Sequence, residues 1–131
     1  RPWQHVLEPL FGYLVLGYNL SKNKNINGEA YNFGPVTKHR SVLDLIINLN
    51  KLWNKHNVLY RSIKKANNFK EANLLALNSN KAKIQLGWNC NLNFNETLNL
   101  IYDWYLEFYI NKKDIKIISQ KQIAYFISKL K

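Results

Sequence analysis

The sequence predicts an α/β chain in which helices outnumber a few short strands, so that on its own it has an α+β character. Its 131 residues are enough for one domain, and its content of 47% hydrophobic and 14% aromatic residues is enough for a packed core. Segments with helical periodicity recur along the chain, whereas strand-like runs are few and short. So few strands do not complete a doubly wound sheet. The pattern favours an accessory lobe that docks on a larger domain.

The first third of the chain predicts a helix, a loop and a strand. Residues 7–21 form a helix with one apolar face, and Pro9 sits in the first turn, where proline is tolerated. The positions of that face are Leu7, Leu10, Phe11, Leu14 and Tyr18. Residues 22–28 have the composition of a surface loop, and residues 29–33 read as a short strand closed by Gly34 and Pro35.

The middle of the chain contains the clearest helix start. Ser41 is expected to cap a helix over residues 42–53, with Asp44 three residues later. Residues 58–63 resemble a strand, residues 64–73 a polar loop and residues 74–77 a short extended run. Asn78 is then expected to cap a short helix over residues 79–86, which ends at Gly87.

Two further helices are predicted near the carboxyl end. Asn95 is expected to cap a helix with one face formed by Leu98, Ile101, Tyr102, Tyr105 and Phe108. Residues 114–118 have an extended composition. Ser119 and Gln122 form a capping box that is expected to open a last helix over residues 121–130.

Cysteine, histidine and hydropathy exclude several protein classes. The single Cys90 cannot form an intramolecular disulfide, and one cysteine with three scattered histidines is too few for a zinc site, which favours a reducing, cytoplasmic setting. No apolar run reaches the roughly 18 to 20 residues that span a bilayer, so no membrane association is expected. The chain begins at Arg1 and contains no Met, so we expect it to be a piece of a longer protein.

The formal charge of +11 is typical of domains that bind nucleic acid. Sixteen of the 19 basic residues are Lys, however, and they are spread from Lys22 to Lys131 among many Asn and Ile residues. This dispersed pattern favours a solvated lysine-rich surface over a nucleic-acid site.

Motifs for cofactor binding and acyl transfer are missing from the sequence. The five glycines, at positions 12, 17, 28, 34 and 87, are too far apart to form the G-x-G-x-x-G loop of a dinucleotide site. A Y-x-x-x-K spacing occurs from Tyr60 to Lys64, but it runs from a predicted strand into a loop, so it lacks the helical stacking that its chemistry needs. No Ser or Cys lies in a nucleophile-elbow context.

Four segments together resemble one protein family. They are R-P-W-Q-H-V-L-E-P-L at residues 1–10, G-E-A-Y-N-F-G-P at 28–35, N-K-A-K-I-Q-L-G-W at 80–88, with Asn80 where the family carries Ser, and S-Q-K-Q-I-A-Y at 119–125. The sequence is similar to the CDP-glucose 4,6-dehydratase branch of the extended short-chain dehydrogenases, and the opening R-P-W-Q-H-V is specific to that branch. The resemblance covers essentially the whole chain.

The resemblance implies that residues 1–131 are the carboxy-terminal, nucleotide-sugar-binding lobe of such an enzyme. The intact enzyme is a lyase of deoxysugar biosynthesis that uses NAD to convert CDP-glucose to CDP-4-keto-6-deoxyglucose and water. Its NAD site and catalytic residues would belong to an amino-terminal Rossmann domain that is absent from this chain. The implied partners are a CDP-sugar, that Rossmann domain and, in the intact protein, a second copy. The chain alone is expected to be inactive.

Five residues are expected to bind the substrate, namely Arg1, Gln4, His5, Asn32 and Glu71. A guanidinium presents a planar fork of donors that suits the oxygens of a nucleoside diphosphate, so Arg1 is expected to bind and not to perform chemistry. Gln4 and His5 alternate along a predicted strand, and Asn32 offers an amide from the next one.

Glu71 lies in a K-E-A-N stretch that resembles the family's H-E-A-H, with both histidines replaced. Glu71 is expected to position a sugar or base hydroxyl, and the structural alternative is a solvated side chain.

Each assignment has a structural alternative. Arg1 suits a surface ion pair, His5 a packing role and Asn32 a bond to the local backbone, while Trp53, Trp88 and Trp104 are expected in the core.

Three functional alternatives stay open beside the dehydratase. They are a degenerate remnant that folds without binding, a basic nucleic-acid-binding module, and another nucleotide-sugar relative such as an epimerase. Pro2 argues against the epimerase, because such relatives usually carry Asp after the arginine.

Overall fold

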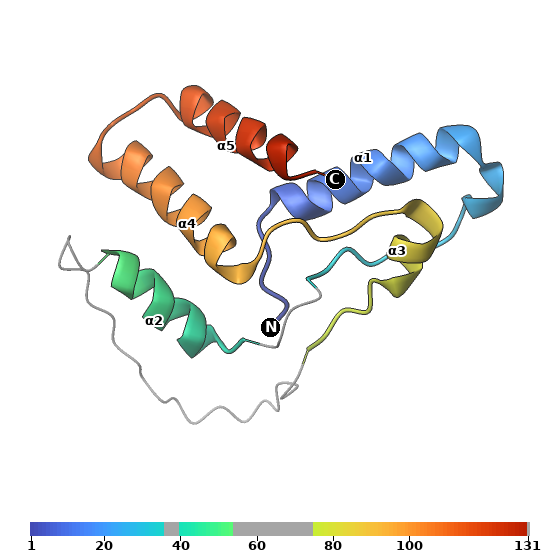
Figure 1. Cartoon of the computed structure of the whole chain (residues 1–131), viewed down its shortest axis with the longest axis horizontal. Coiled ribbons are helices and arrows are strands. Elements are labelled where there is room, and N and C mark those ends of the chain that lie inside the picture. The colour runs from blue at the N-terminus through green and yellow to red at the C-terminus, as the bar shows by residue number, and fades with distance from the viewer. Residues whose placement is uncertain (36–39, 54–74, 131) are drawn as a thin grey trace.

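The computed structural model describes residues 1–35, 40–53 and 75–130 (Figure 1). Its elements are α1 (Leu7–Lys22), η1 (Lys24–Ile26), α2 (Val42–Trp53), α3 (Asn80–Leu86), α4 (Phe94–Tyr105), a π-helical turn η3 (Leu106–Ile110) and α5 (Ile115–Lys129). The prediction of mostly helices is confirmed for these ranges, whereas the predicted short strands do not form in them, so the described part of the chain is helical and not α/β. The predicted strand at residues 58–63 and the loop at 64–73 lie outside it.

The predicted strand at residues 29–33 is an irregular segment whose backbone bonds to side chains instead of to a neighbouring strand. The amide of Gln4 donates to the carbonyl of Phe33 (2.8 Å). The hydroxyl of Ser79 accepts from the N–H of Gly34 (2.9 Å) and donates to its carbonyl (3.1 Å). These bonds satisfy backbone groups that a sheet would otherwise pair. Residues 1–6, also expected as a strand, are irregular too.

Helix α1 begins where the sequence predicts, and Leu7 and Phe11 of the predicted face pack against the core, but the rest of that face does not. Leu14 and Tyr18 are 73% and 66% exposed. The inward side instead contains Glu8 and Gly12, with Phe11 and other apolar side chains packed against the core. Periodicity identified the helix but not its orientation, because α1 has apolar residues on both sides.

The cap predicted for α2 is confirmed, and α3 starts one residue later than predicted, with Ser79 at the N-cap position and Asn78 before it. Ser41 and Asp44 exchange hydrogen bonds, in which each side chain accepts the other residue's backbone N–H (3.0 and 2.8 Å). The side chain of Asn78 accepts from the N–H of Asn80 at the start of α3 (2.9 Å). Gly87 ends α3 with a left-handed φ of 71°, and the backbone N–H of Trp88 donates to the carbonyl of Ala82 (3.3 Å).

The starts predicted for α4 and α5 are wrong by a few residues. Asn93, not Asn95, caps α4, because Asn93 is three residues before Glu96 and forms a reciprocal capping box with it. Residues 114–118, expected as extended, contain the N-cap Asp114 and the first turn of α5. The β-branched isoleucines there join the helix because Ile118 lies on one buried stripe with Gln122 and Phe126.

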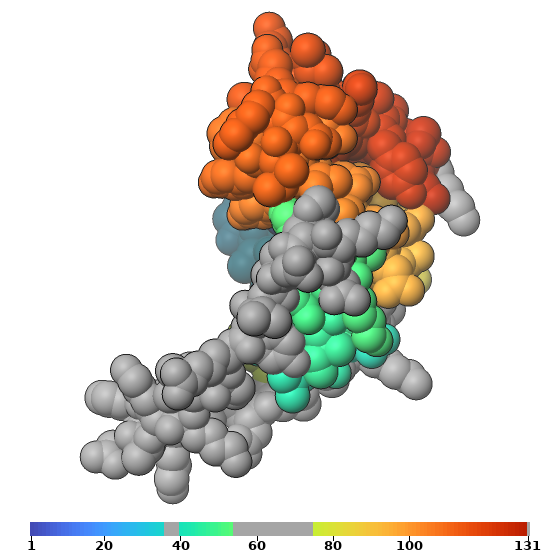
Figure 2. All heavy atoms as spheres, turned by 90° about the vertical axis from the view of Figure 1, so that its left-hand side faces the viewer, coloured from blue at the N-terminus to red at the C-terminus, as the bar shows by residue number. Residues whose placement is uncertain are grey.

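Two adjoining hydrophobic clusters form the core. One is built on Phe33, Ala82, Leu86 and Trp88, and the other on Leu92, Leu100 and Phe126. Phe11 of α1 packs against both clusters. Helix α2 lies against α4, where the rings of Trp53 and Tyr102 meet edge to face at 5.1 Å. In the space-filling view, α4 and η3 stand at one end of the molecule, with α5 beside them and α2 below (Figure 2).

The carboxylate of Glu8 is completely buried and joins the first turn of α1 to the segment before α4. One oxygen accepts the backbone N–H groups of Asn91 (2.8 Å) and Leu92 (2.7 Å), and the other lies 3.5 Å from the Asn91 side-chain amide. A buried carboxylate is tolerated when such bonds replace its hydration. Glu8 therefore fixes the path of the chain after Trp88.

Replacing Gly12 by alanine is expected to destabilise the protein. A Cβ at position 12 would lie 2.6 Å from the ring of Phe33, which is itself buried against Trp88. The expected loss is about 1 to 2 kcal/mol, because overpacking outweighs the better helix propensity of alanine. Gly17→Ala is the control, since its Cβ meets nothing within 4 Å and should stabilise by about 0.5 to 1 kcal/mol. Urea unfolding measures both variants, and equal stabilisation by the two would contradict the packing described here.

Glu8→Ala is expected to lower the free energy of unfolding by about 2 to 4 kcal/mol, because it leaves two backbone donors without an acceptor. Glu8→Gln keeps an acceptor oxygen and should lose less. Urea titration of both variants checks this order. If the Glu8→Ala variant had the same free energy of unfolding as the unaltered chain, the hydrogen bonds of Glu8 would give no net stabilisation. That result would contradict the structural role described for Glu8.

Candidate functional site

A cavity of about 300 Å³ lies where the start of the chain meets α3 and the segment that leads into α4. Its walls come from residues 1–3, 76–80 and 88–90, together with side chains from residues 35, 40, 83 and 94. Residues distant in sequence meet here because Glu8 holds the segment after Trp88 against α1, and Ser79 holds the start of α3 against Gly34.

The cavity is cationic. Arg1, Arg40 and Lys83 line it, and among the described lining residues none is Asp or Glu. The backbone nitrogen of Arg1 donates to the carbonyl of Arg40 (2.8 Å), which brings the two arginines together across 39 positions of sequence. Positive charge from three separate segments in one concave site favours an anion that carries several oxygens.

Arg40 also has neighbours of its own. Its guanidinium lies over the ring of Phe94, 5.1 Å from the ring centroid. The pKa of the Asp44 carboxyl group is lowered, mainly by hydrogen bonds from Ser41. The positive charge of Arg40 adds a smaller effect in the same direction. Because Ser41 engages that carboxylate in the α2 cap, Asp44 does not occupy the cavity.

One side of the cavity is aromatic. Trp3, Trp88 and Phe94 contribute to it, and Trp88 is 1% exposed. The indole nitrogens of Trp3 and Trp88 are buried, and neither has a hydrogen-bond partner in the described part of the chain. The expectation that Trp88 is a core residue is therefore confirmed, yet the same side chain borders the cavity.

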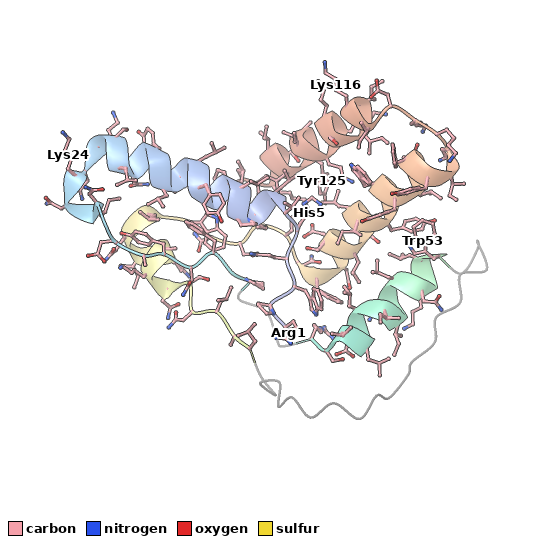
Figure 3. The ribbon with its side chains drawn as sticks, turned by 180° about the vertical axis from the view of Figure 1, so that it is seen from behind. Arg1, His5, Lys24, Trp53, Lys116 and Tyr125 are labelled. Carbon is pink, nitrogen blue, oxygen red and sulfur yellow. The ribbon has the colours of Figure 1, made fainter. Side chains whose placement is uncertain are left out.

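The predicted site residues do not gather in one place. Arg1 lines the cavity, whereas His5 is buried at the other end of the segment that leads into α1 (Figure 3). There His5 accepts the N–H of Leu7 on Nδ1 (3.3 Å), and burial lowers its pKa. His5 borders a separate, largely apolar cavity of about 320 Å³ with Trp104 and Ile123.

Gln4 and Asn32 occupy connecting positions. Gln4 donates to the carbonyl of Phe33, and its own side-chain oxygen is buried without a partner among the described residues. Asn32 is exposed and donates to the carbonyl of Asn78 (3.4 Å), so it borders the cavity wall without lining the cavity. Glu71, and the Tyr60 to Lys64 spacing, lie outside the described residues.

Sequence reasoning alone misses Arg40 and Lys83. Lys83 lies one helical turn after Ser79, on the side of α3 that faces the cavity, and Arg40 directly precedes the cap of α2. Both positions carry a local signal, a cation beside a predicted helix start. Nothing local indicates that these two helix starts meet at Arg1.

The larger groove between α4 and α5, about 540 Å³, suits an anion less well. Glu96, Asp103 and Glu107 line it, and two of these already pair with lysines: Glu96 with Lys129 (2.8 Å) and Glu107 with Lys113. Burial, with a smaller effect of Glu107, raises the pKa of Asp103. Over the described ranges, no group of three or more metal-ligating side chains occurs and no helix is long and apolar enough to span a membrane.

Comparison with known proteins gives one informative relative. The chain is 34% identical over 129 residues, 98% of its length, to a CDP-glucose 4,6-dehydratase of Salmonella typhimurium. It spans 35% of the length of that relative. No family model matches the sequence, and no solved structure matches it.

This identity confirms the resemblance to the CDP-glucose 4,6-dehydratase branch over essentially the whole chain. The chain is a homologue of CDP-glucose 4,6-dehydratase over about a third of that enzyme's length.

Proposed function

We propose that this chain is the nucleotide-sugar-binding, carboxy-terminal part of a CDP-glucose 4,6-dehydratase, and that it holds the diphosphate of a CDP-sugar in the cationic cavity. The observation that carries the proposal is the meeting of Arg1, Arg40 and Lys83 in one cavity whose described lining includes no carboxylate. The relative is named for CDP-glucose, which suggests a nucleoside diphosphate sugar as the ligand. The positive charge of the cavity matches the negative charge of such a diphosphate.

A diphosphate suits the cavity on three physical grounds. Its oxygens only accept hydrogen bonds, and the arginine forks of Arg1 and Arg40 present donors in a geometry that phosphate oxygens match. Lys83 adds a point charge from the α3 side. The volume of about 300 Å³ lies at the lower end of the range for small-molecule pockets, enough for a diphosphate and part of its attached groups.

The roles of the other predicted residues follow from their positions. Gln4 supports the cavity indirectly, because it ties the segment after Arg1 to the carbonyl of Phe33. Asn32 is near enough to the wall to act at its edge. Contact of Gln4, His5, Asn32 and Glu71 with substrate stays a prediction.

Dehydration needs groups that we do not assign to this chain. The resemblance implies NAD in the intact enzyme, but the five glycines form no dinucleotide loop and the described residues include no strand to carry one. We therefore propose that NAD and the catalytic residues belong to the part of the relative that has no counterpart here, a Rossmann domain. This chain binds the substrate for that domain, in an enzyme that assembles as a homo-oligomer.

Calorimetric titration of the full chain with CDP tests the proposal. CDP and CDP-glucose are expected to bind, whereas cytidine, which lacks the diphosphate, is not. Arg1→Ala, Arg40→Ala and Lys83→Ala should each weaken CDP binding by about 10- to 100-fold, the value of a charge-assisted hydrogen bond. Lys24→Ala and Lys116→Ala are matched controls, because these exposed lysines lie far from Arg1 (Figure 3).

Three results would contradict the proposal. Failure of CDP to bind would favour the degenerate remnant. Equal weakening by Lys24→Ala and Lys83→Ala would indicate attraction to the overall charge of +11 instead of to the cavity. RNA or DNA binding that is tighter than CDP binding and falls steeply with salt would favour the nucleic-acid alternative.

A further inference from the structure

We infer that the indole N–H groups of Trp3 and Trp88 are hydrogen-bond donors to the phosphate oxygens of the ligand in the cationic cavity. This inference rests on the proposed function. It assigns a role in ligand recognition to Trp3, which lies in the opening family motif, and to Trp88, which the sequence predicts as a core residue. It starts from the two unpartnered donors at the cavity wall.

Buried polar groups normally have partners, so these two nitrogens are exceptions that call for an explanation. Both are covered by protein atoms, and within the described ranges no oxygen or nitrogen accepts from either of them. The ring of Phe33 packs edge to face on Trp88 at 5.2 Å, but it contains no oxygen or nitrogen that could accept from the indole. A donor in this condition is destabilising until an acceptor reaches it.

The other two tryptophans do not share this lack of a hydrogen-bond partner. The indole nitrogen of Trp104 donates to the hydroxyl of Ser119 (3.3 Å), away from the cationic cavity. The indole nitrogen of Trp53 is not among the buried groups that lack a partner. The two unpartnered indoles of this chain, as far as the structure describes it, therefore both belong to residues that line the cationic cavity.

The surrounding charges say which acceptor fits. Arg1, Arg40 and Lys83 line the same cavity as the two indoles. Their positive charge favours an acceptor that is anionic. Phosphate oxygens are acceptors without competing donors, so they pair with guanidinium, ammonium and indole N–H together. Because each indole nitrogen is covered in this structure, the inference requires both rings to turn toward the cavity when the ligand binds.

Indole ¹H–¹⁵N NMR signals of the full chain test the inference. The four tryptophans give four side-chain signals, and Trp3→Phe, Trp53→Phe and Trp104→Phe each remove one, so that Trp88 is assigned without a substitution in the core. Titration with inorganic pyrophosphate, and then with CDP, should move the Trp3 and Trp88 signals downfield and leave the Trp104 signal in place.

Affinity supplies a second readout. Trp3→Phe keeps an aromatic ring but removes the donor, and it should weaken pyrophosphate binding about tenfold, while Trp104→Phe should not. If pyrophosphate binds through Arg40 and Lys83 while the Trp3 and Trp88 signals stay fixed, the inference is wrong and the proposed function stands. If neither pyrophosphate nor CDP binds, both fail.

Discussion

The buried carboxylate of Glu8 accepts hydrogen bonds from the backbone N–H groups of Asn91 and Leu92, which lie more than 80 positions further along the chain. These bonds bring the segment after Trp88 to the start of α1, where Leu92 joins Leu100 and Phe126 in one core cluster. Phe11 packs against this cluster and against the other one. A charged group can hold this position because its hydrogen bonds replace the water lost on burial.

The cavity follows from the same arrangement. Once residues 88–92 are fixed, the neighbouring Trp88, Asn89 and Cys90 form one wall, and the segment that enters α1 brings Arg1 to face them. Ser79 completes the enclosure through its paired bonds to Gly34. The positive charges are thus carried by irregular segments and helix starts whose positions depend on a few buried polar contacts, which is common for binding residues on a rigid scaffold.

Local signals predicted the local structure well. The Ser41 and Asp44 pair, Asn78 and Gly87 each fix a helix end through neighbours in sequence, so α2 and α3 appear within one residue of where they are expected. The strand at residues 29–33 was wrong because its backbone partners are the side chains of Gln4 and Ser79, far away in sequence. The motif singled out Arg1, which lines the cavity, whereas the positions of Arg40 and Lys83 and the burial of Glu8 depend on tertiary contacts that no short pattern encodes.

The most direct test of a diphosphate in this cavity is the alkylation rate of Cys90, the single cysteine, which lies in its wall. Burial, reinforced by the negative charge of Glu8, raises the pKa of this thiol to about 12, so thiolate is scarce at neutral pH and the rate increases as the pH is raised. At one fixed alkaline pH, saturating CDP should slow alkylation several-fold, and cytidine should not. An unchanged rate at every CDP concentration would contradict the account.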